Sequence, residues 1–249
     1  GFPESLLAPD DELSMKWRQN FIRTYLERDL PLLGLSADPV LISKLWRMAA
    51  HMSGDLLNME TLARSLSIHG TSVRRYLDFL ESAYLIRRLP PYFSNLKKRL
   101  IKSPKIYLRD TGLLHQLLGI SSFFDLSGNH ALGASWETYI IEQVASQLPD
   151  WAELFFYRTH DGTEADLVIA RAGKAEILVE IKYSTTPKPS KGFYIAAEDL
   201  DTQRQYMICP VEQGFPLSEK IQVLSYREIG QLFEATRPDR PRPDDGHPV

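Results

Sequence analysis

The sequence has a single cysteine and no long apolar run, and both absences limit what the protein can be. Cys209 cannot form a disulfide within the chain, so a secreted design held by disulfides is excluded. Its position in the apolar run 206–209 favours a buried side chain over a nucleophile. There is no stretch of about 18 apolar residues and no basic segment leading into an apolar one at the N-terminus. We therefore expect a cytoplasmic protein without a membrane partner.

Several motifs that mark common active sites are also missing. The chain lacks a Gly-x-x-x-x-Gly-Lys-Ser/Thr loop, so it carries no nucleotide site of that kind. It lacks a Gly-x-Ser-x-Gly elbow, and its six histidines are scattered without the spacing of zinc ligands. Any chemistry must therefore come from carboxylates and basic side chains.

The 249 residues, 43% of them hydrophobic, are enough for two compact units. We predict a linker helix within residues 1–36, a winged-helix domain at 37–125, a second domain at 126–236 and a disordered tail at 237–249. In the first segment Asp10 is a candidate N-cap, and Trp17, Phe21 and Tyr25 recur at helical spacing as far as Pro31. The tail combines four prolines with polar residues and cannot build a core.

The pattern in the first predicted domain is that of a winged helix. Apolar residues at helical spacing predict short helices at 41–52, 58–66 and 73–84, with a turn at Gly70 before the third helix. Strands are expected at 84–89 and 105–108, on either side of a segment that contains Pro90 and Pro91. In such domains the third helix can enter the major groove of DNA. Its candidate contacts are Thr71, Ser72, Arg74 and Arg75.

A local cationic stretch sits in a chain whose formal net charge is -3. Residues 87–109 contain eight basic side chains and no acidic one. Basic groups on a wing contact the phosphate backbone and make binding salt-dependent, so DNA is the expected partner. The candidates here are Lys97, Lys98, Arg99 and Lys102. The alternative is a solvated strand edge that lysines protect against aggregation, or a surface for a protein partner.

The second predicted domain alternates between helices and strands. We expect a helix at 136–148, strands at 154–158, 165–170 and 176–183, a helix at 197–205, strands at 206–209 and 221–225, and a helix at 226–234. This order indicates a mixed sheet covered by helices. The whole chain is therefore predicted to be an α/β (α+β) protein, a helical winged-helix domain followed by a mixed-sheet domain.

The strands of this domain carry the candidate chemistry. Alternation places Glu180 and Lys182 on one face of their strand, and the preceding strand should bring Asp166 near Glu180. Two adjacent carboxylates need a compensating cation, and Mg²⁺ prefers such oxygen ligands. Lys182 would then orient or deprotonate a water, or stabilise charge on a phosphate.

The run from Asp166 over thirteen residues to Glu180-Ile181-Lys182 resembles the core motif of the PD-(D/E)xK nuclease superfamily. The first helix of that fold often adds a glutamate, which Glu137 matches here. The resemblance implies a nuclease-like domain in which Glu137, Asp166 and Glu180 hold Mg²⁺ or Mn²⁺ and Lys182 completes the catalytic set. Ala165 stands where the motif often has proline.

A wider set of segments resembles the C-terminal half of prokaryotic AAA-type ATPases, in which a P-loop domain precedes a domain of unknown function. The segments are Gly1-Phe2-Pro3-Glu4, Glu27-Arg28-Asp29-Leu30, Tyr107-Leu108-Arg109-Asp110-Thr111-Gly112-Leu113, residues 133–137, Tyr157-Arg158 and Gly162-Thr163-Glu164-Ala165-Asp166. The resemblance implies an AAA-type ATPase domain in cis, before Gly1, which would bind ATP.

Several functional interpretations stay open at this stage. The chain could cleave DNA with Mg²⁺, or it could be a non-catalytic module that binds DNA or a protein partner and regulates the ATPase half. Glu180 and Lys182 could form a plain ion pair on the sheet, and Glu137 could be a surface charge. The aromatic residues of the first helix also allow an oligomer.

Overall fold

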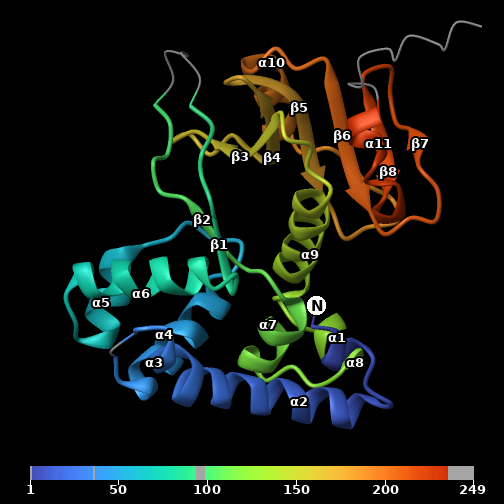
Figure 1. Ribbon diagram of the computed structural model, residues 1–249. Coiled ribbons are helices and arrows are strands. Elements are labelled where there is room, and N and C mark those ends of the chain that lie inside the picture. The colour runs from blue at the N-terminus through green and yellow to red at the C-terminus, as the bar shows by residue number, and fades with distance from the viewer. Residues whose placement is uncertain (1, 36, 94–98, 235–249) are drawn as a thin grey trace, which may run out of the picture.

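The computed structural model describes residues 2–35, 37–93 and 99–234. Two of the predicted DNA contacts, Lys97 and Lys98, and the tail predicted at 237–249 lie outside this part of the chain. The described residues form a helical half and a sheet-containing half, and a two-stranded hairpin runs between them (Figure 1).

The helical half begins with a long helix that changes its winding near its end. Its main part follows an N-cap at Asp10, whose side chain accepts a hydrogen bond from the backbone of Leu13. The elements of this half are α1 (Pro3–Leu6), α2 (Asp11–Thr24), the π-helical turn η1 (Tyr25–Asp29), α3 (Leu30–Leu32), α4 (Pro39–His51), α5 (Met59–Leu66), α6 (Gly70–Ser82), β1 (Ile86–Leu89), β2 (Lys105–Leu108), α7 (Thr111–Leu118) and α8 (Phe123–Ser127).

One apolar core holds this half together and includes the N-terminal segment. Leu26, Leu30 and Leu35 are buried in the same cluster as Trp46 of α4 and Leu117 of α7. The stretch predicted as a linker helix at residues 1–36 therefore packs as part of the helical half. Its aromatic side chains stack on one another along α2, with Trp17 and Phe21 at 5.1 Å between ring centroids.

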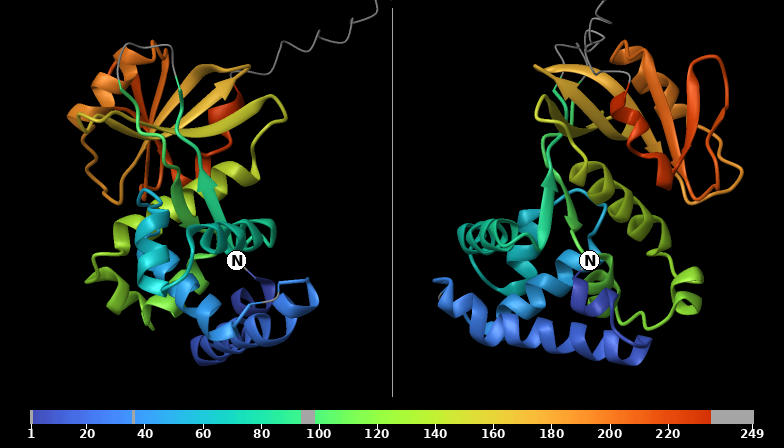
Figure 2. Two further views of the ribbon diagram at one scale, coloured as in Figure 1. Left: turned by 90° about the vertical axis from the view of Figure 1, so that its left-hand side faces the viewer. Right: turned by 45° about the vertical axis from the view of Figure 1, so that its right-hand side comes forward.

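The winged-helix arrangement predicted from the sequence is confirmed. Helices α4, α5 and α6 are followed by β1 and β2, which pair antiparallel with Ile86 opposite Leu108 and Leu89 opposite Lys105. The turn between α5 and α6 starts at Ser67, which adopts a left-handed conformation at φ 54° and ends α5. The exposed side of α6 is left free of other elements, as the left view of Figure 2 shows.

The second half is a mixed six-stranded sheet with helices on both faces, as expected. Its elements are α9 (Leu132–Ser146), β3 (Ala152–Arg158), β4 (Glu164–Arg171), β5 (Lys174–Ile181), α10 (Lys191–Asp199), β6 (Arg204–Cys209), β7 (Phe215–Pro216), β8 (Ile221–Ser225), η2 (Tyr226–Glu228) and α11 (Gln231–Glu234). The strand order is β3-β4-β5-β6-β8-β7, antiparallel from β3 to β5, parallel from β5 to β8, and antiparallel at β7.

The two faces of the sheet have separate cores. Ile140 and Ile141 of α9 pack with Ile177 and Val179 of β5 on one face. Phe193 of α10 packs with Leu178 and other residues on the opposite face. The predicted helix at 197–205 was wrong in position, because α10 occupies residues 191–199, and the short strand β7 was not predicted.

A β-bulge in β4 changes which face its residues occupy. On β3, Phe155 pairs with Val168 and Tyr157 pairs with Ala165, so the two residues Asp166 and Leu167 oppose Phe156 alone. Ala165 and Val168 belong to the core on the α10 face, whereas Leu167 belongs to the core on the α9 face. The bulge therefore interrupts the alternation of faces at Asp166 and Leu167.

The hairpin extends beyond β1 and β2 and runs along the edge of the large sheet. Pro91 forms a parallel bridge with Phe156, and Leu100 forms an antiparallel bridge with Thr159. Both partners lie at the outer strand β3, so the hairpin covers an edge that would otherwise be open. Figures 1 and 2 show the two arms of the hairpin reaching from the helical half to this edge. The wing is therefore attached to the second half.

Candidate functional site

The acidic residues predicted for catalysis meet the hairpin at the junction of the two halves. Glu137 on α9 accepts a hydrogen bond at Oε1 from the hydroxyl of Tyr107, at 2.5 Å. The same oxygen lies 3.1 Å from Nζ of Lys105, and this ammonium lies 2.6 Å from Oε1 of Glu164. The Lys105 side chain is only 4% exposed. A buried cation from β2 thus bridges carboxylates from α9 and β4.

The charges at this junction depend strongly on one another. Burial lowers the pKa of Lys105, but the negative charges of Glu137, Asp166 and Glu164 raise it more, so its pKa lies above the ordinary value. Burial and the neighbouring Glu137 also raise the pKa of Tyr107. Both groups therefore remain protonated at neutral pH and act as donors to the carboxylates.

Asp166 lies close to this bridge and contacts the backbone of β5. Its Oδ2 accepts a hydrogen bond from the backbone N–H of Ile181 at 2.8 Å. Burial and the nearby charge of Glu137 raise the pKa of Asp166 to about 7, although Lys105 and Lys182 act in the opposite direction. Asp166 is therefore an acid that can hold a proton near neutral pH.

Glu180 points to the other face of the sheet. It alternates with Val179 and Ile181, which both belong to the core on the α9 face. Its carboxylate oxygens accept hydrogen bonds from the backbone N–H of Ser190, the N-cap of α10, at 3.2 and 3.0 Å. Nζ of Lys182 lies 3.0 Å from Oε1 of Glu180, so the predicted common face of this pair is confirmed. The ion pair considered as the plain alternative is present.

Of the predicted metal ligands, Glu137 and Asp166 lie close enough for their charges to interact, whereas Glu180 is held by Ser190 and Lys182. Within residues 2–35, 37–93 and 99–234, no group of three or more His, Cys, Asp or Glu side chains is placed to hold a metal ion. The ammonium of Lys105 already bridges Glu137 and Glu164, and Glu180 is engaged on the opposite face. The side-chain arrangement does not fit Mg²⁺ or Mn²⁺, and metal binding here stays a prediction.

The residues predicted to contact DNA on α6 lie at its surface. Thr71, Arg74 and Arg75 are exposed and Ser72 is half-buried. Neither arginine has an ion-pair partner in the part of the chain that the structure describes. One turn of α6 therefore presents two free cations and two hydroxyls to solvent.

Four of the six basic residues of the cationic stretch that the structure describes pair with carboxylates within the protein. Arg87 and Arg109 both pair with Glu142 of α9, at 2.5 and 2.8 Å. Arg88 pairs with Asp78 and Glu81 of α6. Together with Lys105, these side chains join the hairpin to α6 and to the second half. Much of the cationic stretch is therefore an internal electrostatic interface.

Arg99 and Lys102 differ from this group because they are exposed and unpaired among the described residues. They line a cavity of about 620 Å³ together with His160 of the turn between β3 and β4 and the exposed ring of Phe93. The backbone N–H of His160 donates to the carbonyl of Arg99 at 3.0 Å, which fixes the turn against the hairpin. This is a second cationic surface.

Lys105, Tyr107 and Glu142 are central to the junction, and none of them was predicted to belong to the carboxylate site. The sequence holds one signal for Lys105, a lysine that opens the otherwise apolar run 105–108, all of which is buried. A buried lysine needs a carboxylate partner, but the sequence does not say which one.

No helix in the described ranges is long and apolar enough to cross a bilayer.

Two solved structures are similar to this chain, both at low TM-scores. The transcriptional regulator PA3341 has a TM-score of 0.25 and 23% identity over 53% of this chain and 93% of that one. A half-complex of Thermococcus gammatolerans McrB AAA+ hexamers with bound McrC has a TM-score of 0.29 and 13% identity over 75% of this chain and 70% of that one.

The sequence relatives are longer than this chain. It is 42% identical over 239 residues to the uncharacterized protein Rv2008c of Mycobacterium tuberculosis (strain ATCC 25618 / H37Rv) and to the uncharacterized protein Mb2031c of Mycobacterium bovis (strain ATCC BAA-935 / AF2122/97). The alignment takes in 94% of this chain but 54% of either relative, so the chain spans about half their length. Residues 1–123 match the family model "Domain of unknown function (DUF8612)", and residues 132–229 match "Domain of unknown function (DUF4143)".

Proposed function

We propose that this chain is a DNA-binding module in which α6 contacts the major groove and the surface of Arg99 and Lys102 contacts the phosphate backbone. The observation that carries the proposal is a difference in how the basic side chains are used. Arg87, Arg88 and Arg109 form ion pairs with carboxylates of the same chain. Arg74 and Arg75 are exposed and have no ion-pair partner within the described ranges. Free arginines on the third helix of a winged helix are the groups that reach bases and phosphates.

The elements that carry the two cationic surfaces, α6 and the hairpin, lie on the same side of the molecule. The left view of Figure 2 shows α6 and the two arms of the hairpin facing the viewer together. A duplex that meets α6 can therefore continue toward the hairpin. Contacts at both places would add their phosphate charges and steepen the salt dependence of binding.

Fluorescence anisotropy with a labelled duplex tests this proposal. Replacing Arg74 and Arg75 together by alanine should weaken binding, and replacing Arg99 and Lys102 should weaken it independently. The matched control replaces Lys16 and Lys220, which are exposed on α2 and beside β8 and remove the same charge. Equal affinity of the α6 variant and this control would exclude α6 as the contact.

We propose that the second half is a nuclease-like scaffold that does not cleave DNA. The resemblance to PD-(D/E)xK nucleases supports the fold of this half, and the bridge of Lys105 between Glu137 and Glu164 supports the absence of turnover. A cleavage assay on supercoiled plasmid with Mg²⁺ or Mn²⁺ is the direct test. Nicking that disappears in Asp166→Asn and Lys182→Ala would establish the catalytic alternative.

The proposed role of the module is to regulate an AAA-type ATPase domain in cis. Support comes from the resemblance of this sequence to the C-terminal half of such ATPases and from the greater length of the relatives. ATP would bind in that other domain. The test compares DNA-stimulated ATP hydrolysis by the longer relative with and without alanine substitutions at the positions that align with Arg74 and Arg75.

A further inference from the structure

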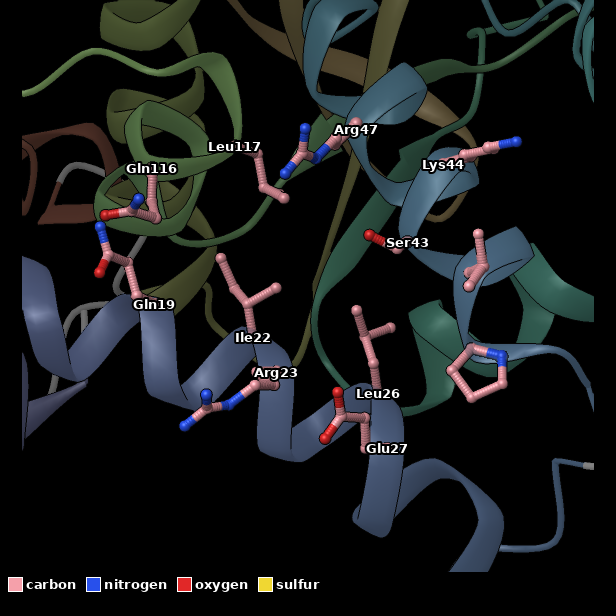
Figure 3. Close-up of a pocket in the computed structure, with 12 residues that line it drawn as sticks. Gln19, Ile22, Arg23, Leu26, Glu27, Ser43, Lys44, Arg47, Gln116 and Leu117 are labelled. Atoms are coloured by element: carbon pink, nitrogen blue, oxygen red, sulfur yellow. The ribbon is translucent and has the colours of Figure 1, made fainter.

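The groove between α2, α4 and α7 is separate from both cationic surfaces and has an apolar floor. Its volume is about 580 Å³. Figure 3 shows Ile22 of α2, Leu26 of the following π-helical turn and Leu117 of α7 pointing toward one another across the groove. Val40, at the start of α4, adds a side chain that is 61% exposed. Leu26 and Leu117 are largely buried, so the apolar surface open to a partner comes mainly from Val40 and the half-buried Ile22. An apolar patch inside a surface groove is typical of a site that receives apolar side chains.

The rim of this groove is cationic. Arg23, Lys44 and Arg47 line it together with a single acid, Glu27. All three cations are exposed, and none has an ion-pair partner among the described residues. In Figure 3, Arg47 extends over the groove beside Leu117, while Lys44 and Arg23 point outward from its edges. The rim therefore complements a negatively charged partner.

The π-helical turn adds a structural observation at the same place. It interrupts the regular hydrogen bonding of the first long helix and contributes Leu26 and Glu27 to the groove. Such turns are rare inside helices and are frequently found at functional sites. The irregular turn, the apolar floor and the unpaired rim thus coincide in one groove.

We propose that this groove binds an acidic amphipathic helix of a protein partner, with the apolar side chains of that helix on Val40 and Ile22 and its carboxylates on Lys44 and Arg47. DNA fits less well, because the charged phosphates of its backbone gain nothing from contact with apolar side chains. Helix-in-groove recognition uses the combination found here, an apolar stripe flanked by charges. This inference goes beyond the proposed DNA binding and does not depend on it.

The probe is a synthetic helical peptide with leucine along one face and glutamate along the others, labelled for fluorescence anisotropy. Two companion peptides test the two parts of the groove. One replaces the glutamates by lysine, and the other replaces the leucines by serine. We expect the full chain to bind the first peptide and neither companion, because the rim selects negative charge and the floor requires apolar side chains.

Charge reversal at the rim gives the sharpest result. Lys44→Glu with Arg47→Glu should weaken the acidic peptide about tenfold or more and create binding of the lysine peptide. The control pair Lys16→Glu with Lys220→Glu makes the same change in net charge away from the groove. The milder pair Lys44→Gln with Arg47→Gln replaces the reversal if that variant is unfolded by circular dichroism.

Three outcomes would overturn the proposal. The first is that the acidic peptide does not bind, or binds the rim variant as well as the wild type. The second is that the rim variant loses duplex DNA affinity, which would make the rim a nucleic-acid surface. The third is that light scattering shows a self-associated chain that the rim variant dissociates, which would make a second copy the occupant. DNA binding by the variant Arg74→Ala with Arg75→Ala is measured separately. A loss of DNA binding in that variant does not affect the conclusion drawn from the peptide.

Discussion

The ammonium nitrogen of Lys105 lies 2.6 Å from Oε1 of Glu164, and this contact joins the hairpin of the winged helix to the large sheet. The same ammonium reaches Glu137 of α9, so one buried side chain connects three elements. Arg87 and Arg109 add a second link through Glu142 of α9. The two halves are therefore expected to move as one body rather than as domains on a flexible linker.

Replacing Lys105 by methionine should destabilise the protein. The substitution leaves Glu137 and Glu164 without their shared cation in a largely buried site, and breaking a buried pair in this way costs about 3 to 5 kcal/mol. Urea unfolding followed by circular dichroism measures the loss. Lys102→Met, at an exposed position nearby, should change the free energy of unfolding by less than about 0.5 kcal/mol. Equal effects of the two substitutions would show that the bridge contributes nothing.

The salt dependence of DNA binding gives a count of phosphate contacts on α6. A plot of log K against log salt has a negative slope, and each lost phosphate contact reduces its absolute value by about 0.9. Replacing Arg74 and Arg75 together should therefore make the slope shallower by up to about 1.8 if both arginines contact phosphates. Anisotropy titrations over a series of salt concentrations give this number. An unchanged slope with weaker binding would instead indicate that the arginines contact bases.

The sequence predicted the regular parts of the fold well, because they depend on local patterns. Strands β2 and β8 begin and end at the predicted residues, and the common face of Glu180 and Lys182 follows from alternation alone. The helix predicted at 197–205 failed because its start was placed too late. The N-cap Ser190 follows two prolines and opens α10, and the chain leaves the helix at Asp201, whose φ is 48°.

The candidate site could be predicted only in part, because its geometry depends on neighbouring strands. Alternation along β4 cannot reveal that Asp166 and Leu167 share one partner residue on β3, and this bulge interrupts the alternation at Asp166. The role of Lys105 depends on how the hairpin docks on the second half. Its partner Glu164 follows it by 59 positions in the sequence, and no local pattern relates them.

Stability should fall in mild acid because of His115. Its Nε2 lies 2.7 Å from the hydroxyl of Ser135, and burial followed by the positive charge of Arg18 lowers its pKa below 6.5. The unfolded chain therefore binds a proton at a pH where the folded chain does not. The contribution of His115 is complete above its unfolded pKa near 6.5 and is lost as the pH falls toward the lower folded value.

Urea unfolding at several pH values between about 5 and 8 measures this effect. The variant His115→Gln keeps a polar group for Ser135 but cannot titrate, so its midpoint should vary less with pH across this range. His51, which is exposed on α4, provides the control substitution. If His115→Gln and the wild type lose stability in parallel, another group is responsible for the acid sensitivity.

Titration with Mn²⁺ tests whether the carboxylates, which are already engaged within the protein, can still take up a metal ion. Lys105 bridges Glu137 and Glu164, and Glu180 is held by Ser190 and Lys182. A cation would have to displace a buried ammonium and draw Glu180 away from these partners, so we expect the wild type and Asp166→Asn to give the same heat by calorimetry. A binding heat that is present in the wild type and absent in Asp166→Asn would mean that the junction rearranges to form a metal site.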